Sequence, residues 1–184
     1  MVTDSWTIRS SRLLLRPLQQ HDAPVLARYR NDPQVAAFQA WPLPYTLEQA
    51  QALIEAMQGR APGDEGWVQI AVTLTSTGQL MGDVALRTFD RGAGGQAEVG
   101  VTLSPEAQGQ GYAQEALTAL LGHVFGTLRL HRVSASIDPR NEGVRRLLER
   151  LGFRHEGTQL QSYWHRGTWT DDAIYALLRE EWNT

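Results

Sequence analysis

Two glycines precede a helix-forming run in the stretch SPEAQGQGYAQEAL, residues 104–117. Gly109 and Gly111 each cost about 0.5–1 kcal/mol of backbone entropy relative to alanine, so a bare backbone must serve a purpose there. The unpaired N–H groups and the dipole at a helix N-terminus favour an anion, and glycine lets the anion's oxygens approach the backbone. The stretch therefore predicts a phosphate-binding turn, with a flexible turn that holds no ligand as the alternative.

The residue types of the chain argue against several other kinds of site. The glycine turn lacks both Gly-Lys-Ser/Thr and the third glycine of G-x-G-x-x-G, which argues against kinases and dehydrogenases. The chain has no cysteine, which excludes disulfides, thiolate catalysis and Cys-ligated metals. Its histidines form neither an i, i+4 pair nor an HExxH motif, so we expect no metal site. The five histidines are His21, His123, His131, His155 and His165.

Length and charge favour a single soluble domain. The 184 residues can bury one substantial core but are few for two, so we expect one domain over residues 1–184. A net charge of −3 suggests neither nucleic-acid nor membrane binding. No apolar run approaches the roughly 20 residues that span a bilayer, and the start, MVTDSWTIRS, lacks a signal peptide's apolar segment. We therefore expect a cytoplasmic protein.

The first 60 residues favour one strand and two helices. Alternating leucines in RLLLRPL, residues 12–18, predict the strand. A helix is expected to begin after Asp22 and to end before Pro33. Thr46 and Gln49 have the spacing of a capping box, so a second helix should begin there. Its apolar face consists of Ala50, Leu53, Ile54 and Met57.

Beyond residue 66, some segments have apolar residues at every second position, as strands do, and others have them at the helical period of about 3.6 residues. The expected elements are strands at residues 67–74, 78–89, 97–103, 131–138, 155–164 and 172–178, and helices at 113–125 and 141–151. The first three strands are joined by short turns, which favours an antiparallel meander. The order indicates an α+β fold with one parallel strand–helix–strand unit in its middle.

Five segments of the chain resemble the GNAT superfamily, the acyl-CoA-dependent N-acyltransferases. Gln108, Gly111 and Ala113 match its Q/R-x-x-G-x-G/A motif, whose backbone N–H groups hold the pyrophosphate of CoA. The segments are similar, in order, to those of the branch that includes the ribosomal-protein N-terminal alanine acetyltransferases, and they cover residues 9–182. They are RLLLRPL, NDPQV, EVGVTLSPEAQGQGYAQEA, NEGVRRLLERLGF and GTWTDDAIYALLREEW.

The resemblance implies the GNAT fold, a mixed, mostly antiparallel sheet of about seven strands flanked by about four helices. A bulge in the strand at Ala97–Leu103 would splay it from the parallel strand at Val133–Asp138 and open a V-shaped gap for the pantetheine arm. Backbone groups of Val101 and Leu103 would bind the pantetheine amides, with Thr102 between them. The pyrophosphate would lie on Gln108, Gly109, Gln110, Gly111, Tyr112 and Ala113.

Two residues of the later helix are further candidates for contacts with CoA. Asn141 matches the family's asparagine that reaches the pantetheine, while its alternative role is the N-cap of the helix, and both can be true. Arg146 would approach the adenosine 3′-phosphate. The implied co-substrate is acetyl-CoA, with no metal.

A carboxylate beside the expected gap is the candidate catalytic base. Acetyl transfer needs a neutral amine, and a primary amine with a pKa of about 8–10 is largely protonated at neutral pH. Glu98 would remove the proton, directly or through water, because it lies on a strand close to where the thioester is expected. An exposed carboxylate without a catalytic role is the alternative, and Asp83 and Asp138 are rival bases.

Position 144 departs from the family pattern. Many relatives carry a serine three residues after the asparagine, where it helps the departing thiolate, whereas Val144 cannot donate a proton. The proton would come from another hydroxyl, with Tyr112 and Tyr163 as candidates, or from water.

The amine acceptor is the part of the reaction that the sequence determines least. Phe38, Trp41 and Tyr45 lie between the first two helices, where they would either hold an apolar or cationic acceptor or pack in the core. A peptide or protein N-terminal amine, a polyamine and an antibiotic amine all remain open, as does a homodimer. The competing class is a non-catalytic acyl-CoA-binding module, which the missing serine supports and Glu98 opposes.

Overall fold

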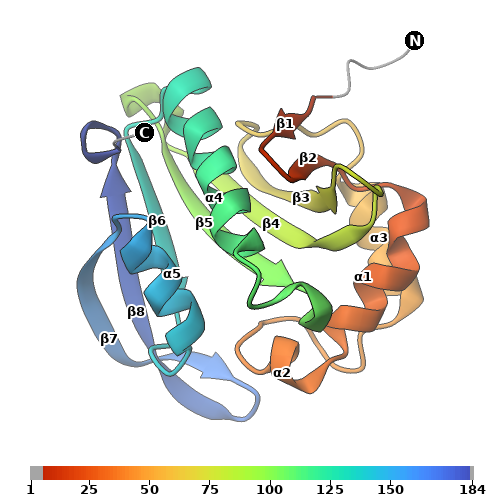
Figure 1. Ribbon diagram of the computed structural model, residues 1–184. Coiled ribbons are helices and arrows are strands. Elements are labelled where there is room, and N and C mark those ends of the chain that lie inside the picture. The colour runs from red at the N-terminus through yellow and green to blue at the C-terminus, as the bar shows by residue number, and fades with distance from the viewer. Residues whose placement is uncertain (1–5, 183–184) are drawn as a thin grey trace.

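One eight-stranded sheet organises the chain, and the computed structural model describes residues 6–182 (Figure 1). The strand order is β1-β2-β3-β4-β5-β6-β8-β7. All neighbouring strands are antiparallel except β5 and β6, which are parallel. The strands are β1 (Ile8–Arg9), β2 (Leu13–Pro17), β3 (Gly66–Leu74), β4 (Leu80–Phe89), β5 (Gln96–Leu103), β6 (Arg132–Ile137), β7 (Arg154–His165) and β8 (Thr168–Leu178).

Helices cover both faces of the sheet. The helices are α1 (Ala23–Arg30), α2 (Pro33–Ala36), α3 (Leu47–Ala56), α4 (Tyr112–Gly122) and α5 (Glu142–Arg150). Figure 1 shows α4 and α5 on one face, with α1 and α3 on the other. Successive side chains of β3 point to opposite faces of the sheet, so Ile70 packs in the core with α4 and Ala71 in the core with α1 and α3. A π-helical turn, His123–Thr127, extends α4.

The expected α+β order is confirmed, with one strand and one helix more than predicted. The additional strand is β1, which pairs with β2. The additional helix is α2, which begins where the sequence predicted an end. Asp32 Oδ1 accepts hydrogen bonds from the N–H groups of Gln34 (2.9 Å) and Val35 (3.1 Å), so it caps a new turn at Pro33.

The last two strands are longer than predicted, and they form a hairpin. Residues 165–171 were expected to separate the strands, but the turn consists of Arg166 and Gly167 alone. Both residues have positive φ, +46° and +85°, which is the backbone of a type I′ hairpin turn. Arginine is uncommon in this conformation, so of the two turn residues only Gly167 indicated a hairpin turn in the sequence.

The expected gap in the sheet is present, between β5 and β6. The two strands pair only from Gln96 to Glu98, which face Arg132 to Ser134. Beyond Glu98, β5 stays paired with β4 and β6 with β8, so the sheet divides into two halves (Figure 1). The bulge expected in β5 is wrong, because its register against β4 is constant from Gln96 to Leu103. Instead, the two half-sheets diverge as whole units.

At Gly82 the backbone of β4 lies so close to that of β5 that there is no room for a side chain. A Cβ atom at Gly82 would lie 2.1 Å from the Thr102 carbonyl oxygen and 2.8 Å from Leu103 Cα. We expect Gly82→Ala to lower the free energy of unfolding by about 1–3 kcal/mol, because backbone atoms must move. Urea denaturation measures the loss. Gly100→Ala is the control, since its Cβ would meet Ala85 at an ordinary 3.8 Å, and equal losses in both variants would contradict the explanation.

Candidate active site

Two hollows meet at the gap between the half-sheets. The central cavity, of about 400 Å³, lies between β5, β6 and the β7–β8 hairpin. The glycine-loop hollow, of about 490 Å³, lies between the end of β5 and the beginnings of α4 and α5. Five residues line both hollows, so the two hollows adjoin, and together they are called the groove. They are Phe38, Gln39, Val101, Asn141 and Val144.

The glycine turn before α4 has the backbone that an anion site needs. Gly109 and Gly111 have φ of +73° and +82°, a left-handed conformation that favours glycine. Among the residues that the structure describes, no hydrogen-bond acceptor pairs with the backbone N–H groups of residues 109–113. A Cβ atom at Gly111 would point toward the Arg12 side chain, 3.5 Å away. Glycine is therefore required there by the twist of the backbone, and the N–H groups remain available to an anion.

The edge of β5 presents alternate residues to the gap. The Ala97 carbonyl oxygen accepts a hydrogen bond of 3.4 Å from Ser134 Oγ on β6, and alternation turns the backbone groups of Val101 and Leu103 in the same direction, toward the gap. The Thr102 carbonyl oxygen faces β4, since a Cβ atom at Gly82 would meet it. Val101 and Leu103 thus turn backbone groups toward the groove. The Thr102 carbonyl does not, although Thr102 itself lines the glycine-loop hollow.

Gln108 lies at the glycine-loop hollow, but its side chain turns back onto β5. Gln108 Nε2 donates a hydrogen bond of 3.2 Å to the Leu103 carbonyl oxygen. This bond satisfies a carbonyl that the sequence analysis left for the pantetheine, while the Leu103 N–H group stays available. Gln110, by contrast, donates through Nε2 to the Glu106 carbonyl oxygen, at 2.6 Å, and does not line the hollow.

Asn141 caps α5 as predicted, and its predicted contact with pantetheine stays a prediction. Its Oδ1 accepts a hydrogen bond of 3.3 Å from the Val144 N–H group and caps α5, and the residue also lines both hollows. Arg146 lies outside both linings, exposed and paired with Glu142 at 2.8 Å. One turn later, Arg150 lines the glycine-loop hollow instead. The predicted contact of Arg146 with a phosphate stays a prediction.

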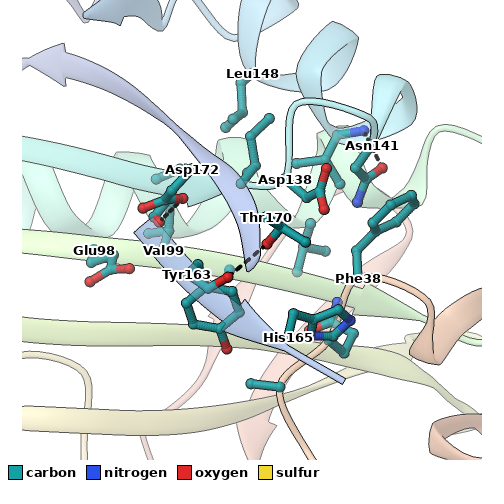
Figure 2. Close-up of a pocket in the computed structure, with 18 of the residues that line it drawn as sticks. Phe38, Glu98, Val99, Asp138, Asn141, Leu148, Tyr163, His165, Thr170 and Asp172 are labelled. Atoms are coloured by element: carbon teal, nitrogen blue, oxygen red, sulfur yellow. Dashed lines mark hydrogen bonds between the residues drawn. The ribbon is translucent and has the colours of Figure 1, made fainter. Parts of the chain in front are cut away.

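Glu98 lies at the point where β5 and β6 separate, and it lines the central cavity (Figure 2). Burial raises the pKa of the Glu98 carboxyl above its usual 4.5, and the negative charge of Asp172 raises it further. Arg87, whose Nη1 lies 3.6 Å from Glu98 Oε2, lowers this pKa in part. A carboxylate with a raised pKa is a stronger proton acceptor, which suits a general base.

Asp83 and Asp138, the two rival carboxylates, are tied to arginines. Asp138 lines the central cavity, but hydrogen bonds from Arg140, the shortest of 2.6 Å, lower its pKa. Asp83 is buried and lines neither hollow. Its carboxylate accepts hydrogen bonds from Tyr29 and Arg30 and from Gln69 Nε2, at 2.5 Å. Glu98 is therefore the better-placed base of the three.

The hairpin turn fastens one wall of the central cavity. Arg166 Nη2 lies within hydrogen-bond distance of the carbonyl oxygens of Ala36 (3.2 Å), Gln39 (3.3 Å) and Trp41 (3.2 Å). His165 is buried, with Nε2 3.0 Å from the Ala37 carbonyl oxygen. The segment 36–41 is thereby held against the β7–β8 hairpin, across the cavity from β5.

Sequence comparison gives this geometry a family. The pattern of the acetyltransferase (GNAT) domain matches residues 12–154, which is most of the chain. The chain belongs to the GNAT acetyltransferase family. It is an N-acetyltransferase, and GNAT acetyltransferases use acetyl-CoA.

Individual relatives agree with the assignment to the GNAT family. The chain is 29% identical over 182 residues to the N-acetyltransferase p20 of Bacillus licheniformis, covering 96% of this chain and 98% of the relative. It is 31% identical over 104 residues to the [ribosomal protein uS5]-alanine N-acetyltransferase of Escherichia coli, covering 56% and 54%. The spermidine N(1)-acetyltransferase of Vibrio cholerae is 29% identical over 86 residues, covering 47% and 50%.

Solved structures share the fold over nearly the whole chain. A GNAT-family acetyltransferase from Bacillus anthracis is 27% identical with a TM-score of 0.83, covering 96% of this chain and all of that one. RimJ of Mycobacterium smegmatis in complex with CoA-disulfide has the same TM-score at 24% identity, covering 100% and 91%. At that identity the likeness to RimJ concerns the fold alone.

Among residues 6–182, no group of three or more His, Asp or Glu side chains is placed to hold a metal ion. Within the same residues, no helix has the length and apolar character needed to cross a membrane.

The structure separates the aromatic candidates into two sets. Phe38 lines both hollows, whereas Trp41 and Tyr45 pack on the buried Arg30 guanidinium, at 4.4 and 5.1 Å from the ring centroids. Tyr163 lines the central cavity, and Tyr112 lines the glycine-loop hollow instead. Only Tyr163 of the two candidate hydroxyls therefore shares the cavity with Glu98.

Sequence reasoning missed Trp67 and His165, both of which line the central cavity. The alternation of Val68 and Ile70 did contain a signal for Trp67, because it placed this residue on the opposite face of β3 from the core. His165 had no such signal. Its position depends on the hairpin turn and on contact with a segment more than 120 residues away.

Asn141→Ala separates helix capping from cofactor contact. Loss of the cap alone should lower the stability by about 1 kcal/mol. Because Asn141 also lines both hollows, we expect the KM for acetyl-CoA to rise as well. Thermal denaturation and steady-state kinetics on one variant measure the two effects. A lower melting temperature with an unaltered KM would leave Asn141 as a helix cap only.

Proposed function

We propose that the chain transfers an acetyl group from acetyl-CoA directly to a primary amine while both substrates are bound, and that the amine is a protein or peptide N-terminus. The observation that carries the proposal is the position of Glu98. Its carboxyl has a raised pKa and lines a cavity that adjoins the glycine-loop hollow.

Acetyl-CoA would lie along the groove from the glycine turn to the gap. The pyrophosphate would accept hydrogen bonds from the free N–H groups of residues 109–113. The pantetheine arm would pair with the open edge of β5 at Val101 and Leu103, as an added strand does. This placement brings the thioester to the gap beside Glu98.

The reaction needs two protons removed from the ammonium group and one supplied to the thiolate. Glu98, directly or through water, first takes a proton from the ammonium group. The neutral nitrogen then attacks the thioester carbonyl, the C–S bond breaks, and the nitrogen's second proton passes to solvent. The departing thiolate takes a proton from solvent or from the Tyr163 hydroxyl, since Val144 has none to give. The two substrates are held together throughout, so positioning contributes much of the rate.

The acceptor has two candidates. A protein N-terminus is supported by the likeness to the ribosomal-protein alanine acetyltransferase. A polyamine is the second candidate, because the described residues that line the central cavity include four carboxylates and no arginine. This lining attracts any cationic amine, and a polyamine carries more positive charges than a peptide N-terminus. The carboxylates are Glu98, Asp138, Asp171 and Asp172.

Thiol release distinguishes these acceptors and tests catalysis itself. Acetyl-CoA is incubated with the protein alone, with alanine- or serine-initiated peptides, and with spermidine, while free CoA thiol is measured. All 17 basic residues of the chain are arginines, so lysine side chains of the enzyme cannot act as acceptors. We expect release with peptides. Release with spermidine alone would select the polyamine, and binding of acetyl-CoA without release for any amine would indicate a non-catalytic module.

Glu98→Gln removes proton acceptance and keeps the shape of the side chain. We expect kcat to fall roughly 10- to 100-fold with little change in acetyl-CoA affinity, because a base acting through water is partly replaced by solvent. The wild-type kcat should decline at low pH as the carboxyl protonates, at a pH above that of an ordinary glutamate because its pKa is raised.

The ratio of the wild-type rate to the Glu98→Gln rate, measured across pH, tests whether Glu98 acts as a base. The defect should shrink as pH rises toward the amine's own pKa, where more acceptor is already neutral. A constant ratio of wild-type to variant rate across that range would show that Glu98 attracts or orients the amine instead. A wild-type rate in Glu98→Gln would remove it from catalysis.

A further inference from the structure

We propose that Arg12 is a positioning residue, which holds the peptide unit between Gln110 and Gly111 so that the Gly111 N–H group points at the cofactor pyrophosphate. The inference rests on the proposed placement of CoA at the glycine turn. It concerns a residue that precedes β2 and is distant from the turn in sequence.

Arg12 reaches the glycine turn through three contacts. Its Nη1 donates a hydrogen bond of 3.1 Å to the Gln110 carbonyl oxygen. Its Nε donates to Glu115 Oε2 at 2.7 Å, and the guanidinium carbon lies 4.4 Å from the centre of the Tyr112 ring. The side chain thus spans the first turn of α4 from outside.

Glu115 fixes the direction of the guanidinium. Its Oε1 accepts hydrogen bonds from the Arg12 backbone N–H group, at 2.7 Å, and from Ser10 Oγ, at 2.6 Å. The Arg12 side chain is 46% exposed and that of Glu115 is 16% exposed, so the pair is anchored on its α4 side. An arginine held at both its backbone and its Nε cannot easily redirect Nη1.

The carbonyl bond determines where the next N–H group points. In a trans peptide unit the C=O and N–H groups point in opposite directions, so holding the Gln110 carbonyl toward Arg12 turns the Gly111 N–H away from it. Gly111 lines the glycine-loop hollow and Arg12 does not. The Gly111 N–H group therefore faces the hollow. Arg12 would act on the anion indirectly, by orienting this peptide unit.

A restraint of this kind is needed because the turn contains glycine. A glycine can adopt both positive and negative φ at little cost, so the peptide unit before Gly111 can flip. A flip would point the Gln110 carbonyl at the phosphate and repel it. The positive charge of Arg12 stabilises the favourable orientation, and it also polarises the peptide unit so that its N–H group is a better donor.

Binding of CoA and of pantetheine, measured by calorimetry, tests the assignment. Pantetheine lacks the pyrophosphate, so it reports the rest of the groove. We expect Arg12→Met to raise the Kd of CoA about 10-fold, the low end for a hydrogen bond to a charged group because the guanidinium is half exposed. The Kd of pantetheine should stay unchanged. An equal rise for both ligands would show a general structural role and overturn the proposal.

Two further variants separate orientation from simple attraction. Arg9→Met removes an exposed positive charge beside the same loop without touching the Gln110 carbonyl, so it should bind CoA as the wild type does. Arg12→Lys keeps the charge but loses the planar fork that joins Glu115 to the carbonyl, so it should lose nearly as much affinity as Arg12→Met. Full affinity in Arg12→Lys, or an equal loss in Arg9→Met, would overturn the proposal in favour of long-range attraction.

The wild-type protein supplies the test of the underlying placement. If it binds CoA no more tightly than pantetheine, the pyrophosphate does not lie on the glycine turn, and the proposed function loses its cofactor site together with this inference. If the wild type binds CoA more tightly than pantetheine but the Arg12 variants keep the wild-type affinity for CoA, the inference alone fails and the proposed cofactor site stands.

Discussion

Backbone pairing between β5 and β6 stops at Glu98, and beyond it no strand within residues 6–182 pairs with this edge of β5. Buried backbone groups left unpaired are costly, so an edge inside a sheet must be satisfied by something other than protein backbone. Gln108 satisfies the Leu103 carbonyl, and a bound pantetheine would satisfy the rest. The gap is thus suited to binding an extended ligand, because the sheet is incomplete there.

The two half-sheets remain together because other parts of the chain cross the gap. One apolar core extends beneath α4 and α5 from Leu13 on β2 to Tyr175 on β8, so both halves share buried residues on that face. On the cavity side, Arg166 and His165 join the hairpin to the segment 36–41. The sheet can therefore open at its centre without dividing into two independent units.

Features that depend on neighbours in sequence were predicted well, and those that depend on distant contacts were not. The capping box at Thr46 and Gln49 forms as expected, and Gly111 has positive φ as a glycine before a helix should. Glu98 was placed beside the gap by strand alternation and by resemblance to the GNAT superfamily. Trp41 was a candidate for acceptor binding, but its ring packs on Arg30, a buried cation that no local pattern reveals. The role proposed for Arg12 was missed because its contacts, with Gln110 and Glu115, are with residues about 100 positions away in the sequence.

The position of β8 between β6 and β7 has a consequence for how the site forms on the ribosome. Residues 96–150, which include the glycine turn and α5, emerge before either of the last two strands, so the glycine-loop side of the groove can assemble early. β7 emerges next but has no edge to join, because its neighbour in the sheet is β8. When β8 inserts, it completes β6, recruits β7 and brings Arg166 to the segment 36–41 together. The hairpin side of the central cavity therefore closes last, from residues made early and late in synthesis.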